Sequence, residues 1–194
     1  MKKVLVYFTN LWYSIFRIRD NEEGKKMEMK TALMDARTLG AYVKNKYREE
    51  YKMEISPIKL QKALYFCFAY WGGLIAKSKE NVKYVEENLS GENEILFDNR
   101  IEAWVYGPVV PDVYKEKNLE NFYEQDPFNG NKFLKTTIDD ILSDLFKVGD
   151  FKLVSISHDD LCWQDAFDIY DSCHEGEIKK AKIIDEYAHK ECIW

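Results

Sequence analysis

The sequence predicts a mainly α fold: a single compact helical domain with a small β element around residues 95–106. Apolar residues recur at three- and four-residue steps over several stretches, which is the pattern of helices that bury one face. Short apolar runs rich in strand-forming residues within 95–106 predict the β element. With 46% hydrophobic and 15% aromatic residues against 9 Gly and 4 Pro, the 194-residue chain can build a large core. No repeat or linker indicates a second domain.

The first two helices are predicted from residue spacing and from a helix-start signal. An apolar stripe over residues 31–47 predicts an amphipathic helix. A second helix is predicted to begin at Pro57, because Ser56 is a good N-cap and proline is tolerated in the first helical turn. Lys59 and Lys62 lie off its apolar face. That face consists of Leu60, Ala63, Leu64, Cys67, Trp71 and Leu74.

Further along the chain, Gly72-Gly73 near the end of this helix predicts close packing against another backbone. The polar stretch 77–94 predicts a loop or an insertion. A third run of apolar residues at helical spacing, over residues 138–146, predicts a helix that ends at Gly149, a good C-terminal cap. A last amphipathic helix closes the chain. The apolar positions of these two helices are Ile138, Ile141, Leu142, Leu145 and Phe146, and then Ile178, Ile183, Ile184 and Tyr187.

The β element is predicted from two short apolar runs, 95–97 and 101–105, on either side of Asp98-Asn99. The segment 107–111 follows, and its two prolines force an extended backbone. Because each proline lacks an N–H group, this segment is excluded from a central strand. Pro111 is then predicted to open a helix through Val113 and Tyr114.

Residues 1–26 are predicted to be a non-native or disordered N-terminal extension that precedes a domain of residues 27–194. The apolar run 4–8 imitates a signal peptide, but polar residues interrupt it and no cleavage site follows. The codons of residues 22–24 (Glu-Glu-Gly) can spell a ribosome-binding site. We therefore expect translation to begin at Met27 or Met29.

The charge distribution bears on the class of partner. The formal net charge of −6 argues against nucleic-acid binding, which depends on Lys and Arg neutralising phosphates. Residues 139–194 hold 14 acidic and 6 basic residues, and no Lys or Arg interrupts the acidic run 159–177. Two interpretations stay open: a solvated acidic face, or a docking surface for a basic partner.

Cysteine and histidine spacing gives little support for a metal site. No C-x-x-C pair occurs, and tetrahedral zinc sites normally use two tight ligand pairs. The pairs that sequence proximity offers are irregularly spaced: His158 with Cys162, Cys173 with His174, and His189 with Cys192. We expect neither a metal nor a cofactor. Without an export signal we expect a reducing, cytoplasmic location with free thiols, and no stretch is long enough to span a membrane.

The sequence offers no enzyme signature. Neither a phosphate-binding glycine loop nor a nucleophile elbow occurs, and the motif H-E-x-x-H of zinc proteases is absent. Ser157-His158-Asp159 contains the residue types of a hydrolytic triad, but triads assemble from positions that are distant in sequence. A lone histidine of this kind is more often structural than a general base.

Three segments together resemble one family. They are 57–66 (PIKLQKALYF), 101–114 (IEAWVYGPVVPDVY), and Ile156-Ser157-His158 followed by Trp163. This set is similar to the Panacea domain, a bacterial and phage family that includes antitoxins of many toxin–antitoxin pairs. The resemblance covers most of residues 31–187, and its central block is the most specific part. Ala63 stands where the family usually has Leu.

The resemblance implies binding rather than turnover: direct neutralisation of a protein toxin, with a phage accessory role as an alternative. The candidate segment offers aromatic rings with polar edges and a proline-stiffened arm, although the same rings can also be core. His158 and Trp163 are expected to bridge the last helices to this arm. The candidate partner-binding residues are Trp104, Tyr106, Gly107, Pro108, Val109, Val110, Pro111, Tyr114, His158 and Trp163.

Two further functional hypotheses remain. A related antitoxin acts as an adaptor that delivers its toxin to an AAA+ protease, so a proteolytic adaptor is the second hypothesis. A hydrolase that uses His158 with a distant acid is the third. We expect no enzyme activity and rank the three in this order.

Overall fold

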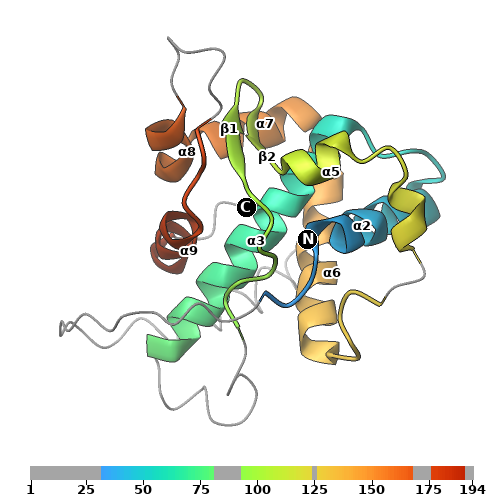
Figure 1. The fold of residues 1–194 in the computed structure, drawn as a ribbon, viewed down its shortest axis with the longest axis horizontal. Helices are drawn as coiled ribbons and strands as arrows, with labels where there is room; N and C mark the ends of the chain where they lie inside the picture. The colour runs from blue at the N-terminus through green and yellow to red at the C-terminus, as the bar shows by residue number, and fades with distance from the viewer. Residues whose placement is uncertain (1–31, 81–92, 124–125, 168–175, 191–194) are drawn as a thin grey trace.

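The computed structural model describes residues 32–80, 93–123, 126–167 and 176–190. In these ranges the chain is mainly helical with one small antiparallel sheet, which confirms the predicted fold class. Figure 1 shows the elements in chain order. They are α2 (Ala36–Tyr51), α3 (Pro57–Glu80), β1 (Glu102–Trp104), β2 (Gly107–Val109), α5 (Pro111–Lys115), the 3-10 helix η1 (Leu119–Phe122), α6 (Lys132–Lys147), α7 (Asp150–His158), α8 (Leu161–Ala166) and α9 (Lys180–His189).

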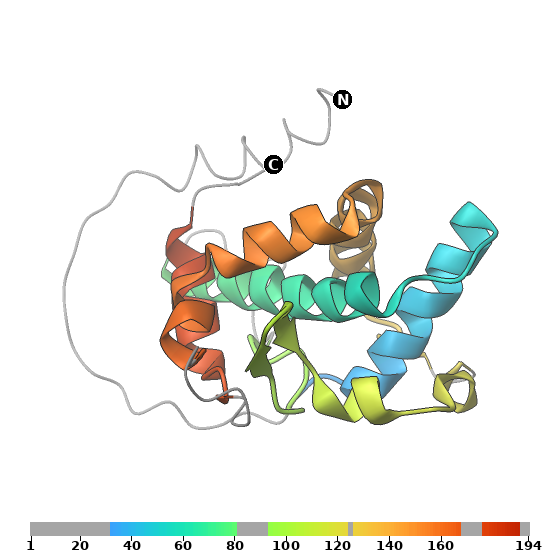
Figure 2. The ribbon, with the colours of Figure 1, turned by 90° about the horizontal axis from the view of Figure 1, so that it is seen from above.

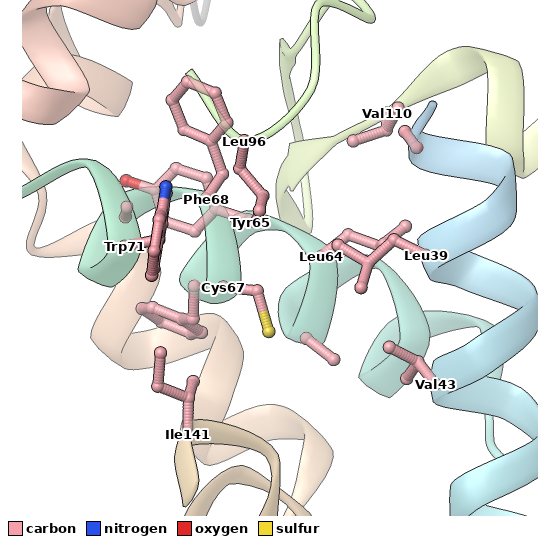
Figure 3. Packing of buried hydrophobic residues seen from close by; sticks show 14 of the residues in the cluster. Leu39, Val43, Leu64, Tyr65, Cys67, Phe68, Trp71, Leu96, Val110 and Ile141 are labelled. Atoms are coloured by element: carbon pink, nitrogen blue, oxygen red, sulfur yellow. The ribbon is translucent and has the colours of Figure 1, made fainter. Parts of the chain in front are cut away.

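Helix α3 runs through the centre of the fold, and the other elements surround it (Figures 1 and 2). Helix α2 packs near its first half and α9 near its second half. In the close view of Figure 3, α3 side chains meet Leu39 and Val43 of α2 on one side and Ile141 of α6 on another. Every residue from Ala63 to Ala69 is inaccessible to solvent, so this stretch of α3 has no exposed face.

The start of α3 follows the local signals. Ser56 Oγ accepts a hydrogen bond from the Lys59 backbone N–H at 3.0 Å, and the helix begins at Pro57 as predicted. Lys59 lies off the apolar face, yet it is buried because α6 and α7 meet there. Its amine donates to the carbonyl oxygens of Phe146 and Val148 and lies 3.5 Å from the Asp150 carboxylate. Lys59 thereby joins the end of α6 to the start of α7.

The glycine pair in α3 serves close helix packing, as predicted. A Cβ on Gly73 would lie 2.6 Å from the backbone carbonyl carbon of Tyr187 in α9. A Cβ on Gly72 would lie equally close to the Ile184 side chain. The pair does not end the helix, which continues to Glu80. Residues 77–80 of the predicted loop are therefore helical, and 81–92 lie outside the described residues.

Two other sequence predictions are corrected, those for residues 95–97 and for Gly149. Residues 95–97 form no regular strand; instead the Leu33 and Met34 backbone N–H groups donate to the carbonyl oxygens of Ile95 and Leu96. The segment 107–109 pairs with β1 as strand β2, and because it is an edge strand this agrees with its predicted exclusion from a central strand. Gly149 precedes α7 as its N-cap, because α6 already ends at Lys147. The predicted extension 1–26 lies outside the described residues.

Candidate partner-binding surface

The candidate residues are organised by a two-stranded hairpin that lies between α8 and α5 in Figures 1 and 2. Its register pairs Glu102 with Val109 and Trp104 with Gly107, so Val105 and Tyr106 form the turn. These two turn side chains are 63% and 58% exposed. Apolar side chains of this size are usually buried, so the hairpin tip is an exposed apolar feature.

The outer edge of β1 is covered by the segment that leads into α9. The Ala103 backbone N–H donates to the Gly176 carbonyl at 2.9 Å, and the Ile178 N–H donates to the Ile101 carbonyl at 2.8 Å. These bonds satisfy the groups that an edge strand would otherwise present to another chain. A partner therefore cannot add a strand at β1.

The outer edge of β2 is satisfied by two side chains of α3 instead of a third strand. The Lys62 amine donates to the Pro108 carbonyl at 2.8 Å. The Val110 backbone N–H donates to Gln61 Oε1 at 2.8 Å. Pro108 itself has no N–H to satisfy. We call this arrangement the β2 joint: Gln61 and Lys62 on α3, bonded to Pro108 and Val110.

Gly107 is required where β2 meets α3 and α7. Its φ is +87°, a conformation that L-residues with a side chain rarely adopt. A Cβ there would also lie 2.4 Å from Ser157 Oγ and 2.9 Å from Lys62 Nζ, both buried. The turn can therefore sit this close to α3 and α7 only with glycine at position 107.

Two of the candidate rings form an aromatic pair beside the tip. Trp104 and Tyr114 meet edge to face with ring centroids 4.9 Å apart. The Trp104 indole N–H donates to the Glu102 carboxylate at 2.9 Å, and Tyr114 is 55% exposed. We define the tip patch as Trp104, Val105, Tyr106 and Tyr114. Of these, Val105 was not among the predicted contact residues.

The expectation that Val109 and Val110 contact a partner is corrected. Val109 is 6% exposed, and Val110 is inaccessible to solvent and packs in the core cluster with Leu39 and Leu64 (Figure 3). Pro111 is buried at the first turn of α5, as the helix prediction required. Pro108 therefore lies in strand β2 and Pro111 begins α5, so the proline-stiffened arm that was predicted to be accessible is buried.

Trp163 joins α8 to the hairpin, but at β1 and not at the proline-stiffened arm 107–111 to which the sequence predicted a bridge. Its indole N–H donates to the Trp104 carbonyl at 3.3 Å, and its ring stacks on His158 with centroids 4.0 Å apart. On its other side it stacks on Phe167. The Nε2 atom of His158 is buried with no hydrogen-bond partner among the described residues. Burial, and then the charge of Lys62, lower the pKa of His158, and a backbone hydrogen bond with Val105 opposes them.

Lys62 is 1% exposed and lies within 4 Å of no carboxylate in the described ranges. Removal of its amine from water lowers the pKa of Lys62 to about 7, because the charged form is disfavoured in a nonpolar environment. The sequence placed Lys62 off the apolar face of its helix, which is correct. Its burial comes from the hairpin that covers that side of α3.

The acidic run 159–177 does not form one continuous face. Asp160 is inaccessible and accepts hydrogen bonds from Tyr65 at 2.5 Å, Tyr187 at 2.9 Å and the Lys190 amine. Burial raises the pKa of Asp160, and these hydrogen bonds oppose the rise. Asp165 pairs with Lys182 on the surface. Positions 168–175 lie outside the described residues.

No metal site is formed by the described residues, because no group of three suitable side chains comes together there. Cys173, His174 and Cys192 of the proposed pairs lie outside those residues.

No described helix combines the length and apolar character needed to cross a membrane. Comparisons with protein-family models, curated proteins and solved structures found no match.

Proposed function

We propose that this protein is a cytoplasmic antitoxin of the Panacea type, which neutralises a protein toxin encoded next to it by direct binding at the tip patch. The observation that carries the proposal is the exposure of Val105 and Tyr106 at the turn of a hairpin whose two edges are already closed, with the exposed Tyr114 of α5 beside them. The resemblance of segments 57–66 and 101–114 to that family supports the class of partner.

The chemistry of the tip patch suits a protein partner. Aromatic side chains bury a large area and have few rotatable bonds, and tyrosine and tryptophan are enriched among residues that dominate binding energy. The tip is also held in advance by the β2 joint and by the Trp163 hydrogen bond. Preorganisation reduces the ordering cost of binding, which is about 0.5–1.5 kcal/mol for each immobilised side chain.

Binding is favoured over catalysis by the placement of the reactive groups. Ser157 is inaccessible and donates to the Val154 carbonyl at 2.8 Å, so its hydroxyl is engaged in the backbone of α7. His158 is stacked on Trp163. The buried acid nearest to it in sequence, Asp160, is bonded to Tyr65, Tyr187 and Lys190. These contacts give each group a structural role.

The direct test is co-expression with the product of the neighbouring gene. The proposal predicts that this product arrests growth alone, and that the full chain relieves the arrest and co-purifies with it. Tyr106→Ala and Tyr114→Ala should each weaken the complex by about 2 kcal/mol or more, the loss found for dominant side chains at interface centres. Phe151→Ala is the matched control, because Phe151 is 71% exposed on a different element, the first turn of α7.

Three outcomes contradict the proposal. The neighbouring product can prove harmless with no complex formed, or the tyrosine variants can bind as tightly as the unmodified chain. If relief of toxicity requires an AAA+ protease and the toxin's half-life shortens only when that protease is present, the protein is an adaptor instead of a direct inhibitor.

A further inference from the structure

The β2 joint contains a lysine whose environment suits an uncharged amine. Lys62 donates to the Pro108 carbonyl, and its Nζ and Ser157 Oγ both approach the position that a Cβ on Gly107 would occupy. All of these groups are buried. A buried ammonium without a carboxylate partner costs several kcal/mol, and proteins commonly respond by leaving the amine neutral.

The other titratable groups around Lys62 do not compensate a charge on it. Strand β2 carries no titratable side chain, and His158 of α7 is a second base. Burial and the charge of Lys62 lower the pKa of His158, and the neighbouring Asp159 only partly opposes them. The other charged or titratable groups of α3, α7 and β1 have partners of their own or are exposed. Lys59, Tyr65, Glu102 and Asp150 are bonded elsewhere, and Lys152 is exposed.

We propose that the β2 joint is a proton-controlled latch: a neutral Lys62 holds the hairpin against α3 and α7, and uptake of a proton from solvent by its amine releases the hairpin. The neutral amine still has an N–H to donate to Pro108, so the closed state keeps its hydrogen bond. The ammonium can regain water only if the hairpin moves away from it. Protonation of His158, whose charge would interact unfavourably with that of Lys62, acts in the same direction.

The size of the effect follows from linkage between proton binding and opening. The amine has a pKa of about 7 in the closed state, and we take its ordinary value of about 10.5 for the open state. The equilibrium constant for opening of the hairpin then rises about tenfold for each unit by which the pH falls from 10 to 8. It rises about fiftyfold in total between pH 9 and pH 7, and it flattens below that range. His158 is mostly uncharged over this interval, so Lys62 dominates it.

The test is hydrogen exchange by NMR on the free full-length chain, at two hydrogen bonds that hold the hairpin, one in the β2 joint and one from α8. The Val110 amide donates to Gln61, and the Trp163 indole N–H donates to the Trp104 carbonyl. After correction for the intrinsic exchange rate, their protection should be about fiftyfold lower at pH 7 than at pH 9. The Cys67 amide in the middle of α3 is the internal reference and should show no such step.

Variants separate the latch from general loosening. Lys62→Met keeps a neutral side chain of similar length and should give protection that does not change over this interval. Lys62→Arg keeps the charge at every pH and should show the low protection throughout. Lys115→Met, at an exposed lysine of α5 beside Tyr114, is the control and should behave like the unmodified chain.

The result that overturns the latch is flat protection of Val110 and Trp163 in the unmodified chain, or a pH step that survives in Lys62→Met. A second measurement holds even if a variant fails to fold: the Cε resonance of one lysine should titrate near pH 7, whereas titration of every lysine above pH 9 contradicts the latch. Both readouts use the free chain, so they are independent of the proposed toxin.

Discussion

Replacement of Gly107 by alanine tests how tightly the hairpin is seated against α3 and α7. Two costs add at this position. A side chain at φ +87° costs about 1–2 kcal/mol. A Cβ placed 2.4 Å from Ser157 Oγ and 2.9 Å from Lys62 Nζ forces buried atoms to move, which costs about 1–3 kcal/mol. We expect Gly107→Ala to lower the free energy of unfolding by about 2–5 kcal/mol.

The chain supplies a matched control for the conformational part of this cost. Gly130 has φ +76°, but a Cβ there meets no atom within 4 Å, so Gly130→Ala should cost only about 1–2 kcal/mol. Urea denaturation followed by tryptophan fluorescence measures both variants. Measurement of Gly107→Ala in a Ser157→Ala background should recover part of the steric cost. Equal destabilisation by the two glycine substitutions would refute the close seating of Gly107.

Three other predictions concern buried groups. Asp160→Asn removes the anion that Tyr65, Tyr187 and Lys190 bond, so it should lower the free energy of unfolding in urea by about 3–5 kcal/mol. The exposed Asp165→Asn should lower it by at most about 0.5 kcal/mol. Similar values for both variants would contradict the buried network. Between pH 8 and about pH 9.5 the unfolded chain binds nearly one proton more at Lys62 than the folded chain, so the stability of the unmodified chain relative to Lys62→Met should increase by about 1.3 kcal/mol per pH unit. Burial raises the pKa of Cys162 to about 12 and that of Cys67 further, so mass spectrometry should find both thiols unmodified by a thiol reagent until the protein unfolds.

The sequence predicted the features whose causes are local. Ser56 and Pro57 determine the start of α3, and Pro111 the start of α5, because capping and proline geometry act over a few residues. The close approach at Gly72-Gly73 was also predictable, since two adjacent glycines inside a helix need a packing reason.

The features that the sequence did not predict depend on which elements meet in space. Periodicity placed Lys62 off the apolar face, but only the docking of β2 decides that this side of α3 is covered. For the same reason Val109 and Val110, expected on an accessible arm, became core. One signal in the sequence was available: two adjacent polar residues, Gln61 and Lys62, directly precede the long stretch 63–76 of α3, which holds no charged residue.

The central claim is that the tip patch contacts a protein partner, and site-specific photo-crosslinking tests it most directly. A photoreactive phenylalanine analogue would replace Tyr106 at the tip or, as the control, Phe151, which is also exposed but lies on α7. Both probes would be used in cells that express the neighbouring gene product. The account predicts a covalent adduct with that product from position 106 and none from position 151. Crosslinking from position 151 alone, while the chain still relieves toxicity, would place the partner on another face and contradict it.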